Sequence, residues 1–142
     1  MRLLPILLLT LLSFASCNRS EDPVSDPRSV DNKDKAFLED IDAARANELI
    51  AAESPPVIID VRTPGEFAAG HIDKAINIDF KSPTFKEELA KLDRDQTYLM
   101  HCRSGGRSGQ AKPIFEELGF KAVYHLEGGT NAWEEAGLPT VK

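Results

Sequence analysis

Short apolar runs alternate with stretches of helical periodicity in the later part of the 142-residue chain, from about Phe37 onward. Asp42 precedes apolar residues at helical spacing and is predicted to cap a helix that ends before Ser54. Continuous apolar runs between turn signals indicate strands that are buried on both faces. Strands are predicted at 57–61, 75–78, 97–101 and 122–126, with further helices starting at 64 and spanning 85–92, 108–118 and 130–136. This alternation predicts an α/β domain whose largely parallel sheet is covered by helices on both faces.

The N-terminal segment has a different pattern. Arg2 is followed by an apolar run from Leu3 to Leu12 and then by small residues, an order typical of a secretory signal peptide. The run has about 10 residues, half of the roughly 20 that a membrane-spanning helix needs, so cleavage is expected. The segment Phe14-Ala15-Ser16-Cys17 resembles the lipobox of bacterial lipoproteins, in which the cysteine becomes the lipidated first residue of the mature chain. A cysteine that merely lies near an ordinary cleavage site is the alternative.

These features divide the chain into three parts. Residues 1–16 are predicted to be a lipoprotein-type signal peptide that is cleaved before Cys17. Residues 17–36 are polar, charged and proline-containing, and they are predicted to form a flexible tether. Residues 37–142 are predicted to fold as one domain. The expected location is the periplasm or the cell surface, with a lipid anchor in a bacterial membrane.

Charge and cysteine content narrow the classes of function. The net charge is −6 and no basic block is present, which argues against a nucleic-acid partner. The two cysteines are Cys17 and Cys102. If Cys17 carries a lipid, Cys102 is the single thiol of the mature chain and requires an explanation of its own. The three histidines, His71, His101 and His125, have no metal-site spacing, so neither a metal nor another cofactor is expected.

The segment HCRSGGRS contains the candidate nucleophile, Cys102, between a predicted strand and a predicted helix. Sites on parallel sheets lie beyond the carboxyl ends of the strands, and a helix N-terminus lowers the pKa of a cysteine placed there. The two glycines allow successive N–H groups to converge on an anion, and the two arginines add cationic donors. The candidate anion-binding residues are Arg103, Ser104, Gly105, Gly106 and Arg107.

Three separated stretches resemble the signatures of single-domain rhodaneses, which are sulfurtransferases. They are VIIDVRTPGEFAAGHIDKAINI at 57–78, HCRSGGRS at 101–108 and LEGGTNAW at 126–133. Lys74 stands where many members of the family have glycine. The resemblance implies a three-layer fold with a parallel five-stranded sheet, and a Cys102 that carries sulfane sulfur as a persulfide. It also implies that Arg103 and Arg107 position an anionic donor such as thiosulfate, and that a thiol or cyanide accepts the sulfur.

The length of the loop separates this interpretation from a phosphatase. Four residues lie between Cys102 and Arg107, whereas tyrosine phosphatases have five. A phosphoryl group needs donors around three oxygens, while a persulfide presents one outer sulfur that a tighter ring can surround. Sulfur transfer is therefore favoured. The alternatives are a persulfide carrier or redox-sensing module without turnover and, third, a phosphatase or arsenate reductase.

Other polar residues receive structural interpretations. Asp60 and Arg62 follow a predicted strand, and an ion pair or backbone hydrogen bonds are expected for them. His101 alternates with Cys102 along the chain, so its side chain is expected on the opposite face of the sheet and is a poor candidate base. Trp133 is expected to close the core.

Overall fold

The computed structural model describes residues 37–142, and the predicted signal peptide, Cys17 and the predicted tether lie outside the described residues. The strands are β1 (Phe37–Ile41), β2 (Val57–Asp60), β3 (Ile76–Asn77), β4 (Thr97–His101) and β5 (Ala122–Leu126). The helices are α1 (Ala43–Ile50), α2 (Pro64–Ala69), α3 (Phe85–Leu89), α4 (Gly106–Glu117) and α5 (Gly129–Glu135).

All five strands form one parallel sheet in the order β1-β5-β4-β2-β3. The four strands predicted from apolar runs are present, and the five-stranded sheet is confirmed. β1 was not predicted as a strand because it is an edge strand in which only Ile41 is buried. Its pairing with β5 along the full length of both strands, rather than an apolar run of its own, makes this segment a strand.

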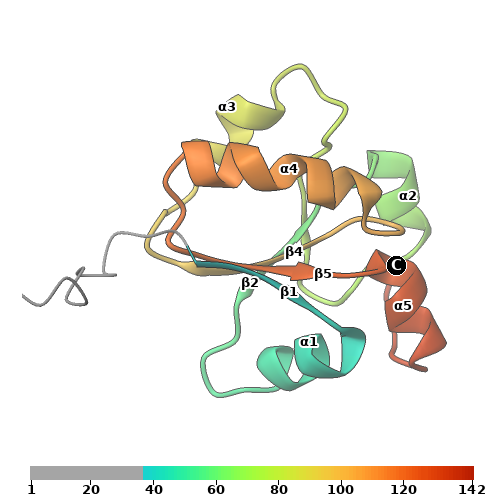
Figure 1. Ribbon diagram of the computed structural model, residues 1–142. Coiled ribbons are helices and arrows are strands. Elements are labelled where there is room, and N and C mark those ends of the chain that lie inside the picture. Colours follow the sequence, from blue (N-terminus) through green and yellow to red (C-terminus); the bar gives the residue numbers. More distant parts are fainter. Residues whose placement is uncertain (1–36) are drawn as a thin grey trace, which may run out of the picture. The chain divides into compact units, whose positions relative to one another are not determined.

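Helices cover both faces of the sheet, as Figure 1 shows: α3 and α4 lie on one face, and α1 and α5 lie on the other. The first face buries apolar side chains of β2 and β4 against Phe85, Leu89 and Phe115. The second buries Leu99 and Leu126 against α1 and α5. The central strands are apolar on both sides because both of their faces are covered, which confirms the predicted three-layer α/β architecture.

Helix ends follow the expected capping chemistry, with two shifts near the candidate loop. The Asp42 side chain accepts a hydrogen bond from the Arg45 N–H and caps α1, as predicted. α4 begins at Gly106 rather than at residue 108, and α5 begins at Gly129 rather than at residue 130. In both helices the N-cap is a glycine at positive φ, so glycine marks the helix start where polar capping residues are the usual signal.

Lys74 adopts a left-handed backbone conformation, with φ 62°, in the turn before β3. Glycine reaches this conformation without a Cβ clash, which accounts for glycine at this position in the family pattern. No other non-glycine residue has positive φ within 37–142. In this same part of the chain no helix has the length and apolar character needed to cross a membrane.

Candidate active site

Cys102 lies immediately beyond the carboxyl end of β4, in the short loop that leads into α4. The residue is only 1% exposed and packs with the core face that contains Met100 and Phe115. The Cys102 thiol is therefore held in a fixed place by the sheet below it and the helix that follows.

The Cys102 sulfur accepts hydrogen bonds from its own loop. The Gly105 N–H donates to Sγ at 3.2 Å and the Ser108 hydroxyl donates at 3.3 Å. Burial raises the pKa of the Cys102 thiol, but the Ser108 hydroxyl and the backbone N–H groups of Ser108, Ser104 and Gly105 outweigh burial and lower it. The loop thus stabilises negative charge on sulfur, which is the nucleophilic form.

The start of α5 holds the outer side of the loop. The Thr130 N–H donates to the Cys102 carbonyl at 2.9 Å, and the Asn131 N–H donates to the Arg103 carbonyl at 3.0 Å. These bonds satisfy loop carbonyls from outside and leave the loop N–H groups to face the sulfur. The approach is close enough to require glycine, because a Cβ on Gly129 would lie 2.2 Å from the Cys102 carbonyl oxygen. The closing signature LEGGTNAW is therefore part of the site.

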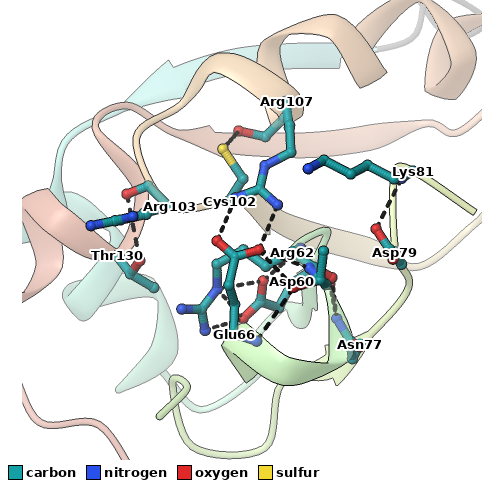
Figure 2. Close-up of polar contacts among 12 residues, drawn as sticks. Asp60, Arg62, Glu66, Asn77, Asp79, Lys81, Cys102, Arg103, Arg107 and Thr130 are labelled. Atoms are coloured by element: carbon teal, nitrogen blue, oxygen red, sulfur yellow. Dashed lines mark hydrogen bonds and ion pairs between the residues drawn. The ribbon is translucent and has the colours of Figure 1, made fainter. Parts of the chain in front are cut away.

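Arg107, in the first turn of α4, is paired with Glu66 of α2. Two parallel hydrogen bonds of 2.7 Å join the guanidinium to the carboxylate, as Figure 2 shows. Glu66 also completes a capping box with Thr63 at the start of α2. Sequence reasoning did not identify Glu66, although the pattern T-x-x-E before a predicted helix is the signature of such a box. The positive charge of Arg107 is thus compensated within the protein. Its guanidinium is held in place by α2.

Replacing Glu66 by glutamine should destabilise the domain and disorder the loop. The Arg107 hydrogen bonds hold the pKa of the Glu66 carboxyl well below its usual range, against the effect of burial. The stabilisation is therefore present above about pH 4.3, the unfolded pKa, and is lost as the pH falls through the folded value. We expect Glu66→Gln to lower the free energy of unfolding by about 1 to 3 kcal/mol at pH 7. The difference between wild type and variant should narrow below about pH 4 in urea titrations.

The matched control is Glu48→Gln, which removes an exposed ion pair between Glu48 and Arg45 on α1. Because both side chains are more than half exposed, this variant should change the free energy of unfolding by less than about 0.5 kcal/mol. Equal effects of the two substitutions would show that the Glu66–Arg107 pair has no special role in holding the loop.

The remaining predicted loop residues surround the sulfur or face solvent. Arg103 and Ser104 are exposed, and the Arg103 carbonyl is fixed by α5 while its side chain extends outward. Gly105 adopts φ 91°, and Gly106 begins α4. Among the described residues no ion pair involves the Arg103 guanidinium, in contrast to Arg107. Arg103 is therefore the loop cation available to an anion from solvent.

Asp60 and Arg62 form a buried ion pair next to the site, and the prediction of a structural pair is confirmed. Arg62 Nη2 lies 2.6 Å from Asp60 Oδ2 and also donates to the Gly70 carbonyl. The Asn77 amide donates to the carbonyls of both Asp60 and Arg62. This network, drawn beside Glu66 in Figure 2, fixes the segment that leads into α2 and so positions Glu66 toward the loop.

His101 is fully buried, and its Nδ1 contacts the Cys102 carbonyl at 3.2 Å. Burial lowers the pKa of His101, so its ring is neutral at physiological pH. Because it points to the carbonyl and not to the sulfur, His101 is not placed to act as a base toward Cys102. Within residues 37–142 no group of three or more potential ligand side chains is placed to bind a metal.

An apolar hollow of about 410 Å³ lies apart from the loop. It is bordered by Ile50, Pro56, Ile72 and Trp133 on the face that carries α1 and α5, and Cys102 does not contribute to it. Trp133 is 3% exposed and its Nε1 donates to the Pro139 carbonyl, which confirms the prediction that it closes the core. The candidate active site is thus identified by the hydrogen bonds to the Cys102 sulfur, and the hollow is not part of it.

Comparison with known proteins identifies the family. Residues 42–136 match the Rhodanese-like domain, and the chain belongs to this family. A sulfurtransferase of Allochromatium vinosum is 31% identical over 105 residues, which cover 74% of this chain and 96% of that protein. The chloroplastic thiosulfate sulfurtransferase 16 of Arabidopsis thaliana is 37% identical over 92 residues, 58% of this chain and 77% of that protein.

The fold agrees with a solved structure of the same family. A rhodanese-related protein from Thermoplasma volcanium superposes with a TM-score of 0.65 and 35% identity, covering 72% of this chain and 97% of that one. Several relatives are longer: the chain spans 55% of the length of an uncharacterized protein of Synechocystis, at 34% identity over 100 residues. The chain is therefore a rhodanese-type protein, and some of its relatives are named as sulfurtransferases.

Proposed function

We propose that the chain is a sulfurtransferase that moves sulfane sulfur from thiosulfate or a persulfide donor, through a Cys102 persulfide, to a thiol or to cyanide. One observation carries this proposal: a buried Cys102 sulfur accepts hydrogen bonds from the Gly105 N–H of its loop and from the Ser108 hydroxyl at the start of α4, which together ring the sulfur. Such a ring stabilises a single anionic sulfur. The names of the relatives from Allochromatium vinosum and Arabidopsis thaliana support the same class of reaction.

The chemistry consists of two displacements at sulfur. The Cys102 thiolate attacks the outer sulfur of thiosulfate, a sulfur–sulfur bond forms to Cys102, and sulfite leaves with the electron pair of the bond that breaks. The terminal persulfide sulfur, which is anionic after this step, is then taken by cyanide or a thiolate, and the Cys102 thiolate is released. Both steps balance without a further oxidant or reductant. The protein's contribution is a lowered thiol pKa and a preorganised ring of donors.

Turnover with thiosulfate and cyanide tests the proposal. The purified chain should produce thiocyanate in proportion to both enzyme and time, and replacing thiosulfate by phosphate ester or arsenate should give no product. A chain that forms the persulfide once but produces no thiocyanate is a carrier, and that result would contradict the proposed enzyme. Hydrolysis of a phosphate ester would instead favour the phosphatase alternative.

Arg103 is expected to recruit the anionic donor. Its guanidinium is exposed at the loop, whereas the charge of Arg107 is met by Glu66. Arg103→Ala should therefore raise KM for thiosulfate by about tenfold while kcat changes less, because one exposed charge-assisted contact contributes on the order of 1 kcal/mol. Steady-state kinetics at two ionic strengths measure this effect. A KM that is unchanged by the substitution would remove Arg103 from donor binding.

We further propose that the chain is exported and anchored to a bacterial membrane through a lipid on Cys17. The order of Arg2, the apolar run and Cys17 supports this location. In a bacterial host that processes lipoproteins, Cys17→Ala should move the protein from the membrane fraction to the soluble exported fraction. Immunoblotting of the fractions, with metabolic labelling by a fatty acid, measures the change. A variant that is exported, cleaved and still membrane-bound would be inconsistent with a lipid at Cys17.

A further inference from the structure

A continuous chain of hydrogen bonds leads from the Cys102 sulfur to the protein surface. Sγ of Cys102 lies 3.3 Å from the Ser108 hydroxyl, which lies 2.8 Å from Nε2 of His125. On the other side of the ring, Nδ1 of His125 lies 2.8 Å from Oδ1 of Asp40. Asp40 is partly exposed and is also paired with Lys112. The hydrogen-bonded series thus joins the loop after β4 and the α4 that follows it to two strands that are distant in sequence, β5 and β1.

The protonation states along this chain follow from the partners. The hydrogen bond from Lys112 lowers the pKa of Asp40, against burial and with a further contribution from His125, so Asp40 is ionised at neutral pH. A carboxylate only accepts hydrogen bonds, so Nδ1 of His125 carries a hydrogen toward Asp40. In a neutral ring this leaves the lone pair of Nε2 facing the Ser108 hydroxyl. While Cys102 is a thiol, Ser108 can then donate to His125 and accept from the thiol. Once Cys102 is a thiolate, the Ser108 hydroxyl donates to the sulfur.

His125 and Ser108 are shielded from solvent and in direct contact. His125 is 5% exposed and Ser108 is fully buried, and the Ser108 hydroxyl lies 2.8 Å from the ring and 3.3 Å from the sulfur. The charged and titratable groups that contact or face His125 are few. Asp40 of β1 contacts the ring directly, Lys112 of α4 reaches it through Asp40, and Cys102 faces it through Ser108. His101 of β4 is neutral.

We propose that Ser108 and His125 relay the proton of the Cys102 thiol, so that His125 sets the pH at which the thiolate forms. In the relay the S–H bond of Cys102 breaks as an O–H bond forms at Ser108. The original Ser108 O–H bond breaks as an N–H bond forms at Nε2 of His125. The products are a thiolate and an imidazolium, and the net charge of the site is unchanged. His125 is a positioning residue, since it acts on sulfur through Ser108. The relay rests on the proposed sulfur-transfer function for its purpose, but its geometry is independent of the donor.

The pH dependence of Cys102 alkylation tests the relay. The purified full chain is treated with iodoacetamide between pH 4 and 10, and modification is quantified by mass spectrometry on the peptide that contains Cys102, so that Cys17 does not contribute. We expect His125→Asn to raise the alkylation midpoint by about one pH unit, since it removes the ring that takes up the thiol proton through Ser108. Ser108→Ala should raise it similarly. In the double variant the shift should not exceed that of the larger single one, because both substitutions break the same relay.

The matched control is His71→Gln, because His71 contacts the Phe67 carbonyl of α2 and, in the described part of the chain, makes no hydrogen bond with Cys102. Its alkylation midpoint should equal that of the wild type. If His125→Asn does not fold, His125→Gln replaces it.

A midpoint that is unchanged in a folded His125 variant would overturn the relay, as would shifts that add in the double variant. The assay contains no sulfur donor. A chain that makes no thiocyanate but shows the coupled midpoint would contradict the proposed function and leave the relay supported. A chain that makes thiocyanate, but whose alkylation midpoint does not respond to the His125 substitution, would support the proposed function and contradict the relay.

Discussion

Gly129→Ala should abolish sulfur transfer and strongly destabilise the domain. The added Cβ would lie 2.2 Å from the Cys102 carbonyl oxygen and 2.8 Å from the Arg103 carbonyl carbon. Both contacts are with backbone, so the loop or α5 has to move. A displacement of about 1 Å at reacting atoms costs about 100-fold in rate, and we expect at least this loss in thiocyanate production. The positive φ of 57° at Gly129 adds backbone strain.

The thermal midpoint of Gly129→Ala should fall by about 10 °C or more, since left-handed strain and overpacking each cost about 1 to 3 kcal/mol. Gly65→Ala is the control on α2, because a Cβ there meets nothing within 4 Å and its φ is not positive. That variant should keep wild-type activity and unfold at the same temperature or slightly above. Full activity in Gly129→Ala would show that the closing signature does not support the loop.

Inserting one glycine between Gly105 and Gly106 should remove most sulfurtransferase activity while the fold persists. The insertion gives the spacing between Cys102 and Arg107 that phosphatases have, and it moves the Gly105 N–H and the Ser108 hydroxyl away from their present contacts with sulfur. Charge-assisted hydrogen bonds contribute about 1.5 to 3 kcal/mol each, so losing one or two should slow turnover by roughly ten- to ten-thousand-fold.

Stability should suffer less than activity in the insertion variant, with a thermal midpoint within about 5 °C of the wild type, because added loop length costs little entropy. The same variant should bind phosphate or arsenate better than the parent, as measured by calorimetry. Undiminished thiocyanate production by a stable insertion variant would show that loop size does not determine the chemistry. Loop length would then not distinguish this protein from a phosphatase.

Local signals predicted most of the fold. The apolar runs that became β2, β4 and β5 are buried on both faces, so their composition alone indicates strands. β1 is not predicted from the sequence, because the segment FLEDI is mostly exposed and becomes a strand only by pairing with β5. Edge strands are therefore where a sequence pattern carries the least information about a sheet of this kind.

The nucleophile was predictable, but its supporting contacts were not. Cys102 stands out by its place between an apolar run and a glycine-rich helix start. Glu66 reaches Arg107 from 41 positions away in sequence, and Asp40 reaches His125 from 85 positions away. No local pattern encodes such contacts, because the parallel topology alone brings those segments together. Gly129 is predictable only in part. The GG pair predicts a turn, but only the packed structure shows that the missing Cβ makes room for the Cys102 carbonyl.

The most direct test of the central claim is the intact mass of the purified chain after incubation with thiosulfate. The account predicts that the wild type gains the mass of one sulfur atom, that the added sulfur maps to Cys102, and that cyanide removes it with release of thiocyanate. The Cys102→Ser variant, folded by circular dichroism, should gain nothing. A sulfur adduct that persists in Cys102→Ser, or a wild-type chain that takes up no sulfur, would contradict the account.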